Sequence, residues 1–198
     1  MRVIAGDKRG KKLSSIPGDK IRPTTDKVKG AIFNSLQFEL KNARVFVDLF
    51  SGSGAMGIEA LSRGIETAYF FDVSQESIDL IKKNIALTGY ESRARVFKIP
   101  GIKGLERLSQ NKVTCDIIFL DPPYIQGEGT GKILEIISEK EILSENGKVV
   151  IESEKSVIMP LEKNNLVCYK SKNYGNSIIS YYCREKNEFE NSSLSGEF

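Results

Sequence analysis

The chain has 198 residues, of which 40% are hydrophobic and 28% are charged, the composition of an ordinary globular protein. The absence of histidine excludes serine–histidine and cysteine–histidine nucleophiles and all histidine metal sites. The three cysteines lie far apart with no metal-binding spacing, so we expect no bound metal. No apolar run is long enough to span a membrane and the N-terminus lacks a signal peptide, so we expect a cytoplasmic protein without a membrane partner.

Positive charge is concentrated near the N-terminus. Residues 1–30 carry nine basic and three acidic residues, a net charge of +6, whereas the other 168 carry 20 basic and 23 acidic residues, a net charge of −3. A basic arm on a mildly acidic body is typical of proteins that bind polyanions, although a solvated basic surface has the same composition. The cations expected to contact nucleic-acid phosphates are Arg9, Lys11, Lys12 and Arg22.

Residues 1–40 are predicted to form an extension ahead of the main domain. Segments Arg2–Ala5 and Lys11–Leu13 are expected to pair as a small hairpin. Residues 24–40 are expected to form a helix capped by Thr24 or Thr25, because apolar residues recur on one face at helical spacing. These apolar residues are Val28, Ile32, Leu36 and Leu40.

Strands and helices alternate from residue 45 onward. The predicted strands are Val45–Leu49, Thr67–Asp72, Ala94–Phe97, Asp116–Leu120 and Lys148–Glu152. The predicted helices are Ala55–Arg63, one between Ser74 and Gly89, and a stretch near Gly131–Lys140. Two further strands, Leu166–Ser171 and Ile178–Tyr182, flank a turn and predict an antiparallel hairpin.

This alternation predicts an α/β protein with a mostly parallel, seven-stranded sheet, helices on both faces and the hairpin as its antiparallel edge. We expect residues 41–184 to form this main domain. Residues 185–198 are polar and are expected to be a disordered tail.

A glycine loop follows the first strand of the main domain. Residues 52–57 read Gly-Ser-Gly-Ala-Met-Gly, and Asp72 follows Gly52 by 20 residues. This is the Rossmann fingerprint, with Asp72 placed for ribose hydroxyls, and alone it would favour NAD. Asp48 would repel a pyrophosphate, however, and suits the cationic sulfonium and ammonium of S-adenosylmethionine. The alternative for Asp48 is a helix cap or turn residue.

The tetrapeptide Asp121-Pro122-Pro123-Tyr124 follows a strand at the edge where open α/β sheets bind ligands. The prolines fix the backbone and remove two N–H donors, which leaves a rigid loop rich in acceptors. The Asp121 carboxylate and the Pro122 carbonyl can each accept one N–H of an exocyclic amine, and Tyr124 can stack on its base. The alternative is a proline-rich turn with a surface tyrosine.

In these motifs the chain resembles the class I methyltransferases, and among them the bacterial ribosomal small subunit methyltransferase D family. The resemblance covers residues 1–182. Its motifs are Met1–Gly6, Arg22-Pro23-Thr24, Ala31–Asn34, Asp48–Gly54, Gly57–Gly64, Asp121–Tyr124, Tyr174-Gly175 and Ser180–Tyr182. The family usually has an acid after the third strand, where this chain reads Lys98-Ile99-Pro100-Gly101, and a glutamate at the position of Gly30.

The resemblance implies a Rossmann-like methyltransferase that transfers a methyl group from S-adenosylmethionine to the N2 amino group of a guanine in 16S ribosomal RNA. The implied catalytic residues are Asp121, Pro122 and Tyr124. The implied cofactor-binding residues are Asp48, Phe50, Ser51, Gly52, Gly54, Asp72 and Val73. We expect the partner to be small-subunit RNA, the subunit or an assembly intermediate, and the enzyme to be a monomer.

Other functions fit parts of this sequence pattern. Adenine N6 of DNA or RNA is the nearest alternative target, because the loop chemistry suits any exocyclic amine, and a protein amide nitrogen is a weaker one. An NAD-dependent oxidoreductase would need the glycine loop but not Asp121-Pro122-Pro123-Tyr124. A non-catalytic RNA-binding protein would need the basic arm alone.

Overall fold

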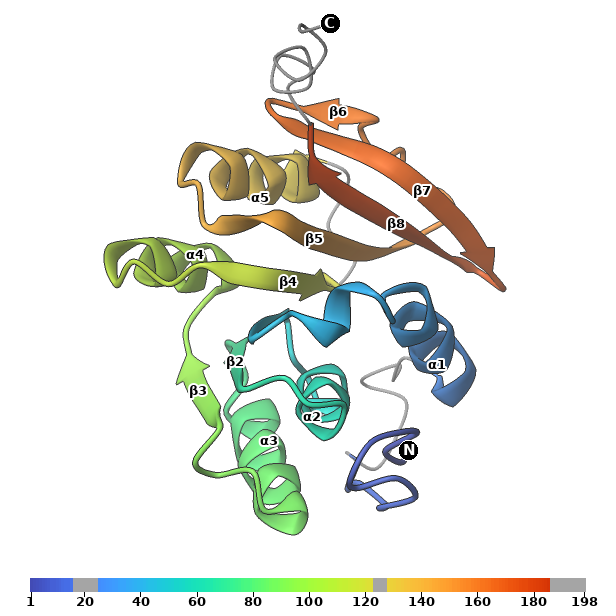
Figure 1. The fold of residues 1–198 in the computed structure, drawn as a ribbon, viewed down its shortest axis with the longest axis vertical. Coiled ribbons are helices and arrows are strands. Elements are labelled where there is room, and N and C mark those ends of the chain that lie inside the picture. Colours follow the sequence, from blue (N-terminus) through green and yellow to red (C-terminus); the bar gives the residue numbers. More distant parts are fainter. Residues whose placement is uncertain (16–24, 123–127, 186–198) are drawn as a thin grey trace, which may run out of the picture.

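A mixed sheet covered by helices on both faces forms the protein (Figure 1). The computed structural model describes residues 1–15, 25–122 and 128–185. The strands found there are β1 (Val45–Leu49), β2 (Thr67–Asp72), β3 (Ala94–Lys98), β4 (Cys115–Leu120), β5 (Leu143–Glu154), β6 (Glu162–Lys163), β7 (Leu166–Tyr174) and β8 (Ser177–Arg184). The helices found there are α1 (Asp26–Ser35), α2 (Ala55–Ser62), α3 (Gln75–Thr88), α4 (Gly101–Gln110) and α5 (Glu128–Glu139), with a short 3-10 helix, η1 (Glu39–Lys41).

The strand order in the described residues is β3-β2-β1-β4-β5-β8-β7-β6. Strands β1 to β5 pair in parallel, whereas β8, β7 and β6 join them by antiparallel pairing. The predicted α/β fold with an antiparallel C-terminal hairpin is therefore confirmed. Within the described ranges the sheet has eight strands in place of the expected seven, because the two residues of β6 are too few to show an alternating pattern.

Helix α4 was not predicted from the sequence, because Gly101 and Gly104 lower its helix propensity. It forms because Leu105 and Leu108 are buried against the sheet. Gly104 allows close packing, since a Cβ at this position would lie 2.7 Å from Cδ1 of Phe71. Tertiary packing here outweighs local propensity.

The helix expected over residues 24–40 ends at Ser35. Thr25 caps its start, with Oγ1 accepting a hydrogen bond from the backbone N–H of Val28 at 3.3 Å. The chain leaves helical geometry at Leu36, which stays buried, and continues through η1 into β1. The apolar periodicity of this segment therefore continues beyond the helix.

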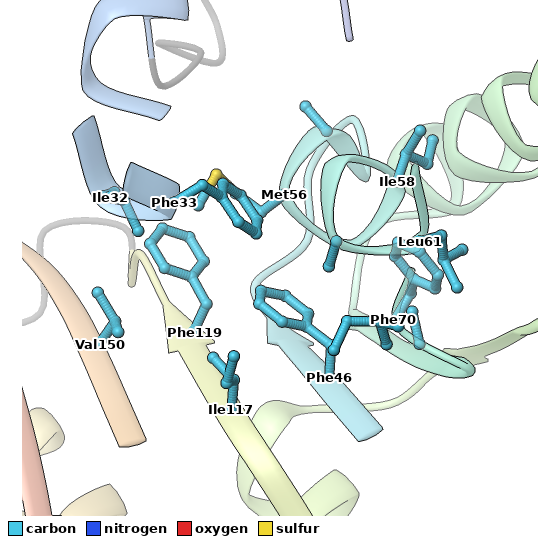
Figure 2. Packing of buried hydrophobic residues seen from close by; sticks show 14 of the residues in the cluster. Ile32, Phe33, Phe46, Met56, Ile58, Leu61, Phe70, Ile117, Phe119 and Val150 are labelled. Atoms are coloured by element: carbon cyan, nitrogen blue, oxygen red, sulfur yellow. The ribbon is translucent and has the colours of Figure 1, made fainter. Parts of the chain in front are cut away.

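Side chains alternate between the two faces of the sheet. Phe46 joins the hydrophobic cluster beneath α1, α2 and α3, whereas Val47 joins the cluster beneath α4 and α5. Figure 2 shows the first cluster, where Phe33 of α1 lies close to Met56 of α2 and Phe119 of β4. This packing fixes α1 and α2 against the strands that end at the candidate site.

Residues 1–15, which we call the N-terminal arm, fold back on themselves as the predicted hairpin. The isolated bridge Arg2↔Lys12 and a hydrogen bond from the Val3 N–H to the Lys11 carbonyl, 2.9 Å long, close it. Val3 and Leu13 are buried in the cluster beneath α1, α2 and α3. The arm is thus packed against the sheet domain. In the described part of the chain, no helix has the length and apolar content needed to cross a membrane.

Candidate active site

Three aspartates lie at the carboxyl ends of neighbouring strands. Asp72 ends β2, Asp48 is the penultimate residue of β1, and Asp121 directly follows β4. Strand β1 pairs in parallel with both β2 and β4, so these ends are adjacent. The strand order also reverses at β1 and β4, and open α/β sheets bind ligands at such a switch point.

Asp48 is the most deeply placed of the three, with 2% of its surface exposed. Its Oδ2 accepts a hydrogen bond of 3.0 Å from the backbone N–H of Gly57, in the first turn of α2. Burial raises the pKa of Asp48 well above its usual range, and the charges of Asp72 and Asp121 raise it further, against the opposing effect of the Gly57 N–H. A cation at this point would favour the ionised form, so the site suits a positively charged ligand.

The glycine loop turns sharply between β1 and α2. Gly52 and Gly54 have φ values of 53° and 75°, in the left-handed region that favours glycine. Ser51 fixes the start of the loop, because its Oγ donates to the Asp48 carbonyl at 2.6 Å and accepts from the Phe71 N–H at 3.0 Å. The backbone of the loop is therefore held against the ends of β1 and β2.

Asp72 binds the same loop from the end of β2. Its Oδ2 accepts from the Gly52 N–H and its Oδ1 from the Ser74 N–H, each at 2.9 Å. A carboxylate has about four lone-pair positions, so these bonds leave acceptor capacity for a ligand hydroxyl. Asp72 thus has a loop-holding role that the 20-residue spacing did not predict.

Apolar groups border the aspartates. Phe50 has a φ of 61°, a conformation that costs a bulky residue energy and is typical of functional loops. Its ring faces Gly101 at the start of α4, where a Cβ would lie 3.5 Å from Cζ of Phe50. Val73, directly after Asp72, is 62% exposed. An exposed valine beside a carboxylate with acceptor capacity is suited to contact a flat ring of a bound ligand.

The loop after β4 is described only at its start. Asp121 and Pro122 are half-buried. The negative charge of Asp121 raises the pKa of Asp48, so the two carboxyl groups are close enough to interact electrostatically. Tyr124 of this loop and Arg22 of the basic segment lie outside the described residues.

The N-terminal arm presents three of the predicted cations to solvent. Arg9, Lys11 and Lys12 are all exposed. Arg9 also lines a cleft of about 370 Å³ between the arm and the start of α1. The cleft is lined by Arg2, Val3, Ile4, Arg9, Gly10, Asp26 and Lys27. Lys11 and Lys12 are not among its lining residues.

The roles of two buried polar residues, Glu59 and Asn84, were not predicted from the sequence. Glu59 is fully buried and accepts from the N–H groups of Ile4 and Ala5, at 2.7 and 3.0 Å, while forming ion pairs with Lys29 and Arg63. Asn84, also fully buried, bonds to the arm and to the glycine loop. In the sequence, each appears as a polar residue on an otherwise apolar helix face. Such a position indicates a buried hydrogen bond but does not identify the partner.

Known proteins resemble this chain over nearly its full length. The family described as conserved hypothetical protein 95 matches residues 1–183. YlbH of Bacillus subtilis strain 168 is 36% identical over 182 residues, covering 92% of this chain and 98% of the relative. A Buchnera aphidicola protein named ribosomal RNA small subunit methyltransferase D is 33% identical, covering 86% of each chain. The solved structure of YhhF from Escherichia coli, 31% identical, has a TM-score of 0.80 and covers 94% of this chain and 99% of that chain.

Proposed function

The chain belongs to the conserved hypothetical protein 95 family and is similar to proteins named ribosomal RNA small subunit methyltransferase D, and we propose that it methylates small-subunit ribosomal RNA. Its cofactor is S-adenosylmethionine. The observation that carries this proposal is the buried Asp48 between Asp72 and Asp121, beside a glycine loop. Residues 41–184 are the catalytic domain, and residues 1–40 are the RNA-binding extension.

The residues of the site fit this cofactor. Asp48 provides negative charge for its cationic methionine end, and Asp72 has acceptor capacity for the ribose. We assign the adenine contacts to the apolar side chains of Phe50 and Val73, and the backbone contacts to the loop formed by Ser51, Gly52 and Gly54. S-adenosylmethionine supplies a methyl group already activated on a sulfonium, so the protein mainly provides positioning.

The loop after β4 orients the target amine. An exocyclic amine is a poor nucleophile, because its lone pair is delocalised into the ring. The Asp121 carboxylate and the Pro122 carbonyl each accept one N–H, which turns the lone pair towards the methyl group. Tyr124 stacks on the base, a contact worth roughly 1–3 kcal/mol. The base must leave its stack to reach the loop, which is easiest in a single-stranded region.

The target we propose is the N2 amino group of a guanine. We also propose that the enzyme acts as a monomer. Transfer of tritiated methyl groups into naked small-subunit RNA, assembly intermediates and complete subunits, followed by nucleoside analysis, tests the assignment. We expect N2-methylguanosine in at least one substrate and none with Asp121→Ala. N6-methyladenosine would replace the base assignment, and no transfer into any RNA would contradict the proposed function.

Asp72→Ala is expected to weaken binding of S-adenosylmethionine by about tenfold or more, the loss expected when a charged hydrogen-bond acceptor is removed. The substitution removes the ribose acceptor and releases the Gly52 N–H. Isothermal titration calorimetry measures the affinity, and thermal unfolding confirms that the variant is folded. An unchanged dissociation constant in a folded variant would exclude Asp72 from the cofactor site.

Replacement of Arg9, Lys11 and Lys12 by alanine is expected to flatten the salt dependence of RNA binding. Each phosphate contact adds roughly −0.7 to −0.9 to the slope of log K against log salt concentration. All three side chains are exposed, so the cofactor affinity should not change. Filter binding across a salt series measures the slope. If the slope is the same in the triple variant, the arm cations make no phosphate contacts.

A further inference from the structure

Asn84 lies on the buried face of α3, with none of its surface exposed. Its Oδ1 accepts a hydrogen bond from the Ser14 N–H at 2.8 Å. Its Nδ2 donates to the Ser14 carbonyl at 3.1 Å and to the Ser53 carbonyl at 2.9 Å. One side chain therefore bridges the end of the N-terminal arm and the glycine loop.

The chemistry of this bridge is specific to an amide. A buried polar group is costly unless it is hydrogen-bonded, and asparagine offers an acceptor and two donors. The peptide groups of Ser14 take the acceptor and one donor, as a neighbouring strand would, and the second donor reaches Ser53. An aspartate of the same shape would face two carbonyl oxygens without a proton to donate.

Ser53 is the central residue of the Gly52-Ser53-Gly54 turn, between the two glycines with positive φ. Its hydroxyl also contacts the Sδ atom of Met1, at 3.6 Å. Both the carbonyl and the hydroxyl of Ser53 are thus connected to the arm, one through Asn84 and one directly. Asp72 and Ser51 hold the other side of the loop.

The arm can serve as an anchor because it is itself fixed to α2. Glu59 binds the N–H groups of Ile4 and Ala5. Ser62 Oγ donates to the Ala5 carbonyl at 2.7 Å and accepts from the Lys8 N–H at 3.1 Å. Gly6 approaches α2 so closely that a Cβ there would lie 1.7 Å from the Ser62 carbonyl oxygen. These contacts hold the arm in one position relative to the helix that follows the loop.

We propose that Asn84 is a positioning residue that holds the cofactor loop in its binding geometry by connecting Ser53 to the N-terminal arm. The proposal rests on the proposed function, because it assigns the loop to S-adenosylmethionine. Its consequence is that a backbone change at Ser14 alters cofactor affinity through Asn84. The arm is then part of the scaffold of the cofactor site as well as a carrier of positive charge.

A double-mutant cycle on the affinity for S-adenosylhomocysteine tests this connection. Asn84→Ala removes the whole bridge. Ser14→Pro removes the Ser14 N–H that Asn84 Oδ1 accepts and fixes φ at position 14, while the sequences of α3 and the glycine loop stay unchanged. We expect Asn84→Ala to weaken binding about fivefold to tenfold and Ser14→Pro about threefold or more. Because the two act on one connection, the double variant should bind like Asn84→Ala alone.

Asn111→Ala is the matched control. Asn111 caps the far end of α4, where its Nδ2 donates to the Arg107 carbonyl at 2.7 Å, so its loss should lower stability without changing cofactor affinity. A merely structural role for Asn84 predicts the same pattern as this control. Unchanged affinity in a folded Asn84→Ala protein would overturn the proposal. If Asn84→Ala does not fold, unchanged affinity in Ser14→Pro would overturn it. A double variant whose loss of affinity is the product of the two single losses would also overturn it. A wild-type protein that does not bind S-adenosylhomocysteine would instead contradict the proposed function.

Discussion

Asp121→Ala is expected to lose nearly all methyl transfer, by about 100-fold or more, whereas Asp121→Asn retains measurable turnover within about tenfold of the wild type. The reason is that in the proposed mechanism Asp121 accepts a hydrogen bond from the target amine and does not have to remove a proton. An asparagine oxygen can accept the same N–H, and an alanine has no acceptor. Proton loss follows methyl transfer, because a methylated ammonium is acidic enough to release its proton to water. Single-turnover rates at saturating cofactor measure the effect apart from binding.

Variants of Tyr124 provide the companion measurement. If the ring stacks on the base, Tyr124→Phe should be mild and Tyr124→Ala severe, since the ring face is lost only in the second. Equal inactivity of Asp121→Asn and Asp121→Ala, with an active Tyr124→Ala, would contradict this mechanism. A general base at position 121 would then be required, because only a carboxylate can accept the proton.

The parallel part of the fold could be predicted because its signals are local. Five short apolar runs, each bounded by glycine or polar residues, gave β1 to β5, although β5 begins at Leu143, ahead of the expected Lys148. The early part of this strand contains Glu145, Asn146 and Gly147, which disfavour strands by propensity. It pairs there with β4, where Cys115 lies opposite Leu143. Pairing with a distant strand is information that a local pattern does not contain.

The motif residues of the site were predictable for a related reason. Asp48, Asp72 and Asp121 each stand at the end of a predicted strand, and parallel strands bring such ends to one edge. The hydrogen bonds that Asp48 and Asp72 accept from backbone N–H groups were not predictable. That the carboxylate of Asp72 holds Gly52, and that of Asp48 reaches Gly57, depends on the loop conformation between them.

The contacts of the N-terminal arm were the least predictable part of the site. Glu59 and Asn84 lie 55 and 70 residues from their partners Ile4 and Ser14. Their partners within the N-terminal arm are backbone groups, so the sequence of the arm gives no complementary residue to search for. A buried polar residue indicates that a partner exists, because an unpaired one is costly, but does not identify it.

Asp48→Asn is expected to weaken S-adenosylmethionine binding by roughly one to two orders of magnitude, the range expected for loss of a charged partner. Since burial raises the pKa of Asp48, the wild-type protein must lose a proton there to present its charge to the cationic ligand. Wild-type affinity should therefore rise with pH as Asp48 ionises, whereas the asparagine variant should bind weakly with little pH dependence. Calorimetry over a pH series measures both, with Asp79→Asn, an exposed carboxylate on α3, as the control.

The same substitution should stabilise the cofactor-free protein. A carboxyl group whose folded-state pKa is raised above its unfolded value binds its proton more tightly when folded, so its contribution to stability is lost as the pH rises through the folded pKa. An asparagine is neutral throughout and its oxygen can still accept from the Gly57 N–H. The melting temperature of Asp48→Asn should thus exceed that of the wild type, by about 2–4 °C for each kcal/mol added to the free energy of unfolding. The difference between the two melting temperatures should increase as the pH rises. If Asp48→Asn instead lowered the melting temperature and left cofactor affinity unchanged, Asp48 would be a cap for α2 with no part in binding.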